Sequence, residues 1–293
     1  MVDPPLYPGK NATMPLSSVV DYYNVRLPEL HPRAHLRRRA SYRLHRGLLT
    51  AQIAGFVLTP YLVPVIKAAT GALFGQRAKL FVRTEDGHPA PPESLYVQAW
   101  DADDVVFLDR FLRTFHALNH LHQGHDGREL LVLDVHLRHV AALPEHHGEV
   151  FETLLHRFGL RTDQVVLRLD ARALHTDAHV QEAARSFTGY GYRLLAAGPD
   201  LDHTDWDLLG ALGVRWVAPQ VQDLEVRYDR GERWRAQTAT GGRIGLWLAG
   251  IDDPEALARA GALGADLIEG NQSSRAARQA PPRYPLSPAD VAV

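Results

Sequence analysis

Hydrophobic and polar positions follow two periods along this chain. Short, almost continuously apolar runs are typical of buried strands, and apolar residues three or four positions apart are typical of amphipathic helices. Strands are predicted on this basis at 56–66, 77–83, 130–135, 165–170, 192–197, 214–218, 244–248 and 266–269. Helices are predicted at 105–122, 150–158, 178–187, 206–212 and 254–263. Such alternation indicates a parallel sheet covered on both faces, and about seven units favour an α/β fold of the modified TIM-like (β/α)8 barrel type over an open sheet.

The two ends of the chain differ from this pattern. Residues 1–35 are rich in Pro, Asn and Ser and predict an extended or partly disordered arm, in which Val20, Tyr23 and Leu27 could form a short docking helix. The barrel is assigned to residues 36–275. Residues 276–293 are proline-rich and predict an extended tail that could dock onto the barrel or onto a partner.

A basic stretch at 31–46 (HPRAHLRRRASYRLHR) predicts a helix that continues through Gln52. Its arginines could contact an acidic partner protein, a membrane surface or a nucleic acid. The alternative is a solvated helix face, with Leu36, Leu44 and Leu48 on the core side. The candidate partner-binding residues are Arg33, Arg37, Arg38, Arg39 and Arg43.

Composition narrows the classes of function. The net charge of −2 does not favour a nucleic-acid binder, and the absence of cysteine excludes disulfides and thiolate chemistry. Residues 1–15 lack a basic segment followed by an apolar one, and no apolar run reaches the roughly 18 residues of a membrane span. A cytoplasmic protein is therefore expected.

The predicted strand ends lack the acids that a metal-dependent barrel enzyme needs. Function in such a barrel lies at the carboxyl ends of the strands. The strand at 192–197 ends in Ala196 and Ala197, and other strand ends show the same absence. This pattern favours a scaffold or binding protein over a hydrolase.

Several segments, in the right order, resemble the EAL domain, the barrel phosphodiesterase family that hydrolyses cyclic di-GMP. The resemblance covers about residues 40–275, so it implies an EAL-type barrel. The matching segments are TGALFGQRAK (70–79) with the family's TG…GxEAL, LDVHL (133–137) with SVNL, FGL and VVLRLD (158–160 and 165–170) with GL…LxLEIT, GYRLLAAGP (191–199) with GxxLALDDFG, VRWVA (214–218) with xxLKID, LAGIDDPEAL (248–257) with AEGVETxExL, and LGADLIEG (263–270) with LGxDxxQG.

The departures from the family pattern imply that its activity is missing. Two-metal phosphodiester hydrolysis needs several carboxylates to hold the cations, and arginines or alanines cannot replace them. No catalytic residue, metal or cofactor is therefore expected, and binding of cyclic di-GMP is doubtful. The family's site positions fall in this chain at Arg77, Phe81, His136, Arg168, Asp170, Ala196, Ala197, Trp216, Ala218, Ala249 and Glu269.

Arg77, Arg168 and Asp170 should point into the same mouth if this correspondence holds. Arg77 and Arg168 could clamp a phosphate, which would make a ligand-binding site. The alternative is an internal ion pair, with Asp170 as the partner of Arg168, that fills a vacated metal pocket.

The histidines form a second candidate constellation. His116 and His120 share a helix face at the spacing of a zinc chelate, but the motif lacks the Glu of HExxH. No recognised motif includes the six other histidines of this region, which are His122, His125, His136, His139, His146 and His147. Surface histidines are the expectation.

The resemblance and its departures imply a catalytically inactive EAL-like protein. The expected role is a protein-interaction scaffold or regulator, in bacterial signalling, motility or polarity control, with another protein as partner and a homodimer also compatible. The alternative is a non-hydrolysing receptor for cyclic di-GMP or another phosphate-bearing ligand. An enzyme with an unrecognised site, for example His136 with Asp134 or Asp170, ranks last.

Overall fold

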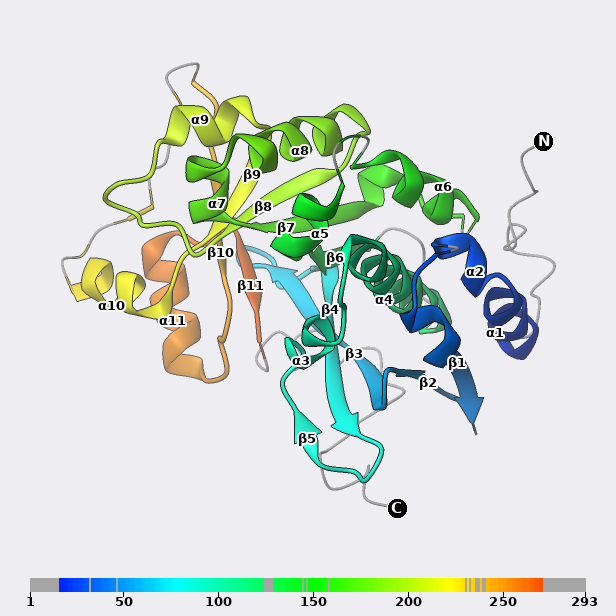
Figure 1. Cartoon of the computed structure of the whole chain (residues 1–293). Coiled ribbons are helices and arrows are strands. Elements are labelled where there is room, and N and C mark those ends of the chain that lie inside the picture. The colour runs from blue at the N-terminus through cyan, green and yellow to red at the C-terminus, as the bar shows by residue number, and fades with distance from the viewer. Residues whose placement is uncertain are drawn as a thin grey trace.

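A computed structural model of the chain describes residues 16–270, except 32, 46, 124–128, 144, 146, 158, 230, 232, 235–237, 239 and 240. Its centre is a closed barrel of eight strands (Figure 1), in the order β3-β11-β10-β9-β8-β7-β6-β4, with β3 and β4 paired to close the ring. The strand bounds are β3 Phe56–Lys67, β4 Leu73–Thr84, β6 Leu130–Asp134, β7 Val165–Asp170, β8 Arg193–Ala197, β9 Val214–Ala218, β10 Gly245–Leu248 and β11 Leu267–Glu269.

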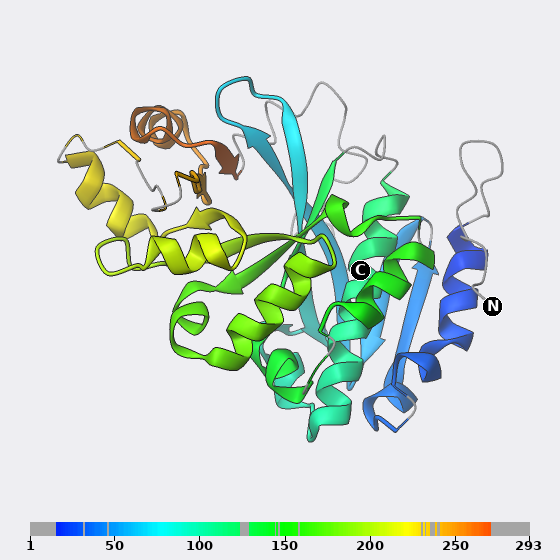
Figure 2. The same ribbon diagram turned by 90° about the horizontal axis from the view of Figure 1, so that it is seen from above.

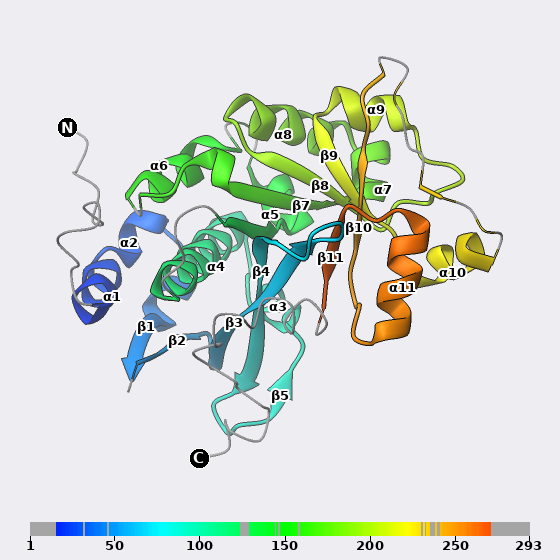
Figure 3. The same cartoon turned by 180° about the vertical axis from the view of Figure 1, so that it is seen from behind.

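One strand of the barrel runs against the others. β3 is antiparallel to both of its barrel neighbours, β4 and β11, whereas the other seven strands pair in parallel. Figure 3 shows β11 beside β3, where the ring closes. The predicted modified TIM-like barrel is confirmed, and the parallel strands have their carboxyl ends at one mouth.

The barrel wall continues into a smaller antiparallel sheet. β3 and β4 are long enough to leave the barrel together, and β2 (Leu48–Ile53) and β1 (Ala40–His45) extend the sheet beyond β3. The two-residue β5 (Pro89–Ala90) pairs with the far part of β4. In Figure 2, the blue helix α1 lies against the blue strands of this sheet, away from the yellow and orange half of the barrel.

Helices cover the outside of the barrel and one face of the smaller sheet. They are α1 Leu16–Val25, α2 Leu27–Leu30, α3 Ser94–Val97, α4 Ala102–His122, α5 Leu137–Ala142, α6 Glu149–Arg157, α7 Ala171–Thr176, α8 Ala178–Gly189, α9 Trp206–Ala211, α10 Val221–Asp229 and α11 Pro254–Leu263, with short 3-10 turns η1 Leu36–Arg39 and η2 Thr162–Gln164. The longest, α4, begins where the Asp101 side chain accepts from the backbone N–H of Asp104, and it buries Phe107, Phe111 and Phe115 against the sheet.

The basic stretch does not form the predicted helix. It forms η1, β1, a turn with Gly47 at a φ of 79°, and β2. Leu49, Ala51 and Ile53 are buried at every second position, the period of a strand rather than of a helix. That alternation was present in the sequence, but the run of arginines before it obscured it.

The expected extended arm is wrong for residues 16–30, which form α1 and α2. Val20, Tyr23 and Leu27 are buried, which confirms the docking helix, and the Asn24 side chain bonds both backbone groups of Tyr42 on β1. Three apolar side chains at helical spacing were therefore a stronger signal than the polar composition around them. The predicted tail at 276–293 lies outside the described residues.

Candidate functional site

The floor of the barrel interior is aromatic. Phe74, Trp216 and Trp247 meet edge to face, with ring centroids 5.3 to 6.3 Å apart. Val132 on β6 and Leu195 on β8 join this cluster. Trp216, which stands at a lysine position of the resembled family, therefore serves as packing beneath the mouth and carries no charge into it.

An ion network lies above this floor. Arg77 on β4 binds Asp134 on β6 at 2.9 Å and Glu269 on β11 at 3.1 Å. Arg168 on β7 binds Asp134 at 3.1 Å, and Lys79 on β4 reaches Glu269 at 3.4 Å. Trp247 donates its indole N–H to the other Glu269 oxygen at 3.2 Å. Three cations thus share two carboxylates, and the network carries one net positive charge.

The network sets the charge states of its members. Withdrawal from bulk water alone would raise the pKa of the Asp134 carboxyl, but the neighbouring Arg77 and Arg168 lower it below its ordinary value. Burial alone would lower the pKa of Arg77, but Asp134 and Glu269 raise it. Both members of the Arg77–Asp134 pair are therefore charged at neutral pH.

Asp170 is not part of this network, so its predicted pairing with Arg168 is wrong. The Asp170 side chain is exposed and caps α7, accepting from the backbone N–H of Ala173 at 2.8 Å. The partner of Arg168 is Asp134. Asp170 is the residue directly before α7, so its carboxylate stabilises the start of that helix as an N-cap and does not pair with Arg168.

The remaining family positions offer small or distant side chains. Ala197 and Ala218 end β8 and β9 next to each other, and Ala196 is fully buried toward the helices. Ala249 follows β10 and is half-buried. Phe81, on the part of β4 that leaves the barrel, stacks on Tyr61 at 4.3 Å.

The residues at the mouth do not fit the metal ions that the EAL resemblance implies. Within residues 16–270 as described, no three His, Asp or Glu side chains are grouped closely enough to hold a metal ion. Asp134 and Glu269 lie at the mouth, and both are occupied by cationic side chains. We derive no metal-dependent step from this site.

His136 points away from the ion network. It caps α5, its Nδ1 accepts from the backbone N–H of Arg138 at 3.2 Å, and its ring stacks on Tyr96 at 3.6 Å. Burial and Arg138 lower its pKa. An alternative enzyme would need His136 paired with Asp134 or Asp170, but each of these three residues binds another group instead.

Several histidines expected on the surface lie inside the protein. His120 and His139 are buried, and His116 is half-buried with its Nδ1 shielded from water. His139 binds the buried Asp109 at 3.3 Å, and Asp109 also binds Arg113 on the next turn of α4 at 2.6 Å. His116 and His120 belong to no metal cluster of the described residues. His125 and His146 fall outside them, whereas His122 bonds the Gly47 carbonyl and His147 is buried.

Sequence reasoning underestimated two residues that organise the mouth. Asp134 was considered only as a partner of His136 in the enzyme alternative, although Leu130, Val132 and Asp134 alternate along one strand and so share the interior face. Lys79 is two residues beyond Arg77 on the same face of β4. The period of two along these strands was the signal that could have found both.

The candidate partner-binding arginines lie on η1 and β1 and in the segment before them. Arg33, Arg38, Arg39 and Arg43 are exposed, and Arg37 is half-buried. Arg33 reaches Asp103 at 3.2 Å. Their exposure agrees with both original interpretations, a partner contact and a solvated surface.

The sequence matches no protein-family model and no curated protein. Solved structures do resemble the fold. A PaMucR phosphodiesterase in complex with cyclic di-GMP has a TM-score of 0.56 at 12% identity, over 73% of this chain and 89% of that one. The EAL-like domain protein YdiV has 0.53 at 15%, over 74% and 91%.

The Xanthomonas citri FimX EAL domain in complex with cyclic di-GMP has a TM-score of 0.53 at 16% identity, over 74% of this chain and 86% of that one. Klebsiella pneumoniae BlrP1 is longer, and this chain spans 57% of its length. At these identities the likeness shows the fold alone, which is an EAL-type barrel. The described helices include none that is both long and apolar enough to span a membrane.

Proposed function

We propose that this protein is a non-catalytic EAL-like regulator that acts by binding another protein, in bacterial signalling, motility or polarity control. The observation that carries the proposal is the occupied mouth. Where a phosphodiesterase needs free carboxylates for cations, Asp134 and Glu269 are held by Arg77, Lys79 and Arg168.

An exposed apolar rim beside the mouth supports a binding role. Trp100 and Val97 are 83% and 75% exposed, and Leu137 is 40% exposed. The guanidinium of Arg138 holds this rim together, because it donates to the carbonyls of Tyr96 and Ala99. An exposed tryptophan on a fixed loop is a typical anchor of protein interfaces.

The first experiment is a hydrolysis assay. The purified chain is incubated with cyclic di-GMP and Mg²⁺ or Mn²⁺, and product formation is followed. We expect none. Turnover that disappears in Arg168→Ala would refute the non-catalytic proposal, because it would show that the mouth performs the chemistry.

The second experiment tests the partner surface. A photo-crosslinking residue is placed at Trp100, and at Val226 on α10 as a control that is 50% exposed and distant in sequence. We expect a crosslinked protein from the first position only, and the purified partner should bind the native chain and lose affinity for Trp100→Ala. Equal crosslinking from both positions would contradict a specific rim. A crosslink to a second copy would identify a homodimer.

A receptor role is the second candidate, because the mouth carries one uncompensated positive charge. Arg168 is 30% exposed and Lys79 34% exposed, so an anion could reach both. Calorimetry with cyclic di-GMP in the presence of a chelator tests it. Saturable binding that weakens in Arg168→Ala would favour the receptor role. If no heat of binding is detected, the protein-binding role remains as the proposal.

A further inference from the structure

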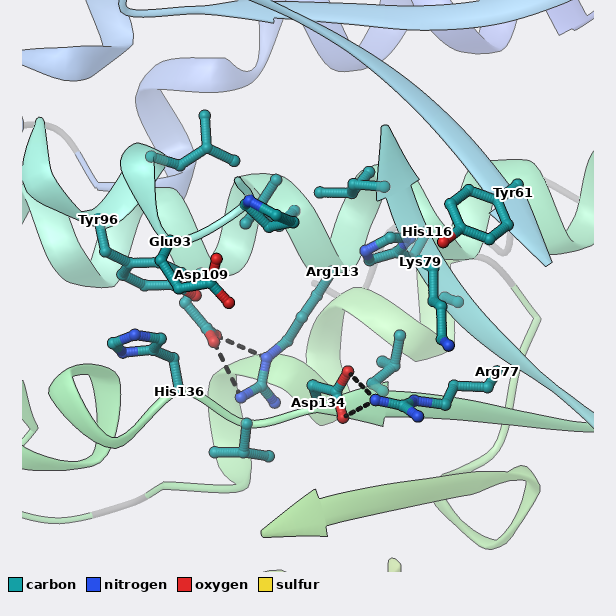
Figure 4. A pocket seen from close by; sticks show the side chains of 17 residues that line it. Tyr61, Arg77, Lys79, Glu93, Tyr96, Asp109, Arg113, His116, Asp134 and His136 are labelled. Carbon is teal, nitrogen blue, oxygen red and sulfur yellow. Dashed lines mark hydrogen bonds and ion pairs between the residues drawn. The ribbon is translucent and has the colours of Figure 1, made fainter. Parts of the chain in front are cut away.

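A cavity lies beside the mouth, at a gap in the sheet. β6 pairs with β4 only at Gly75–Arg77, and β5 pairs with it at Val82–Arg83. The edge of β4 between these two pairings therefore has no strand neighbour among the described elements. α3 and α4 enclose the space left there, a cavity of about 350 Å³ (Figure 4). This volume lies in the range of small-molecule sites.

The walls of the cavity are largely apolar. They are formed by Leu80, Leu95, Leu112, Leu133 and Val135, together with Pro92. The stacked rings of Tyr96 and His136 close one end. Apolar walls beside stacked rings suit an aromatic group, which gains from burial and from ring contacts.

The opposite end of the cavity is polar and positive. Tyr61, Lys79 and His116 converge there (Figure 4). Arg77 beside them is bound by two carboxylates, whereas Lys79 only shares Glu269 with Arg77. Lys79 therefore brings a positive charge that is only partly compensated to this end of the cavity. Glu93 is exposed at the other end, where solvent screens it, and Arg113 and Asp109 neutralise each other.

His116 contributes a polar ring to this end of the cavity. Its Nδ1 is shielded from solvent and bonds no protein atom, which is costly for a polar group. Burial lowers the pKa of His116 to about 4, so at neutral pH the ring is uncharged and offers one hydrogen bond without adding charge.

We propose that this cavity binds a small aromatic carboxylate of one or two rings. Its ring system lies against the leucines and the Tyr96–His136 stack. Its carboxylate accepts from Lys79 Nζ, next to His116. The site is a small-molecule site at the open edge of β4, between α4 and the barrel mouth, so it goes beyond the protein-binding role proposed above. Occupancy of the gap would also brace the β4 edge against α4.

The test uses the full chain and two probes of equal size. One is 2-naphthoate, and the other is the uncharged 2-naphthalenemethanol. Calorimetry or ligand-observed NMR measures their dissociation constants at pH 7. We expect one saturable site for 2-naphthoate and binding of the alcohol about tenfold weaker, which corresponds to about 1.4 kcal/mol for the charge contact. No saturable binding of 2-naphthoate at 5 mM (roughly −3 kcal/mol) would overturn the proposal.

Three variants test whether the probe binds in this cavity with its carboxylate at Lys79. Lys79→Met should weaken 2-naphthoate about tenfold and leave the alcohol unchanged. Lys67, an exposed lysine at the carboxyl end of β3, provides the matched control: Lys67→Met should change neither affinity. Leu112→Trp fills the cavity and should abolish both, with thermal melting confirming that the variant is folded. Unchanged 2-naphthoate affinity in Lys79→Met, or retained binding in folded Leu112→Trp, would overturn the proposal. Failure here leaves the Trp100 crosslinking result unaffected, so the two proposals fail separately.

Discussion

Removing the Asp134 carboxylate should destabilise the fold more than removing Asp170. Asp134→Ala leaves Arg77, which is 12% exposed, with Glu269 as its remaining carboxylate, and it removes the carboxylate that Arg168 binds. Breaking a fully buried ion pair costs about 3–5 kcal/mol, and exposed pairs contribute about 0–1 kcal/mol. Because the Asp134 side chain is itself 47% exposed, we expect an intermediate loss of about 2 kcal/mol.

The matched control is Asp170→Ala, which removes only the cap of α7. Loss of an N-cap costs about 1 kcal/mol. Urea denaturation at pH 7 and low salt gives both free energies of unfolding from the midpoint and slope. An Asp170→Ala variant at least as destabilised as Asp134→Ala would refute the assignment of Asp134 as the centre of the network.

Double-mutant cycles divide the effect between the two arginines. Arg77 meets both Asp134 oxygens, at 2.9 and 3.2 Å, whereas Arg168 meets one at 3.1 Å and is 30% exposed. We expect a coupling energy of about 2 kcal/mol for Arg77–Asp134 and below about 1 kcal/mol for Arg168–Asp134. Molar salt should reduce the second coupling more than the first, because exposed pairs are screened more strongly. The reverse order would contradict the burial argument.

Three further predictions concern buried groups. Burial lowers the pKa of His139 to about 4, so between pH 4 and 6.5 the folded state binds fewer protons than the unfolded state. The contribution of His139 to the free energy of unfolding should be fully present above pH 6.5 and fall by up to about 3 kcal/mol as the pH drops to 4. Urea denaturation of His139→Asn at several pH values should show a weaker dependence of stability on pH. Trp247→Phe removes the N–H that Glu269 accepts and should cost about 1–2 kcal/mol by the same assay, while a neutral effect would contradict that bond. Gly75→Ala should lower the melting temperature, because the added Cβ would lie 2.5 Å from the Leu130 carbonyl oxygen; an unchanged melting temperature would show that β4 and β6 can separate.

The barrel was predictable because its signal is repeated. Each apolar run such as 165–170 coincides with an observed strand, and each helix predicted from residue 105 onward, such as that of Phe111 and Phe115, coincides with an observed helix. The N-terminal sheet was missed because a single hairpin offers only a few alternating positions. The basic residues of η1 led to the prediction of a charged helix, although Leu49 and Ile53 follow the alternation of a strand.

The mouth was only partly predictable, because ion pairing depends on which strands become neighbours. Arg77 and Arg168 were identified as mouth residues, and an internal ion pair was among the interpretations. The choice of partner followed sequence proximity and selected Asp170. The register places Asp134 directly opposite Arg168 on the adjacent strand, a fact that no local pattern contains.

The pairing of β11 with β3 has a consequence for how the molecule folds. Arg77 and Glu269 are 192 positions apart in the chain, whereas the β3–β4 hairpin joins near neighbours. Contacts that span so much of the chain are slow to form, so the hairpin should form early and the β3–β11 seam late. The last strand to dock also delivers the carboxylate that Arg77 and Lys79 share. A chain interrupted before β11 would expose two unpaired edges, on β3 and on β10, and such edges invite aggregation.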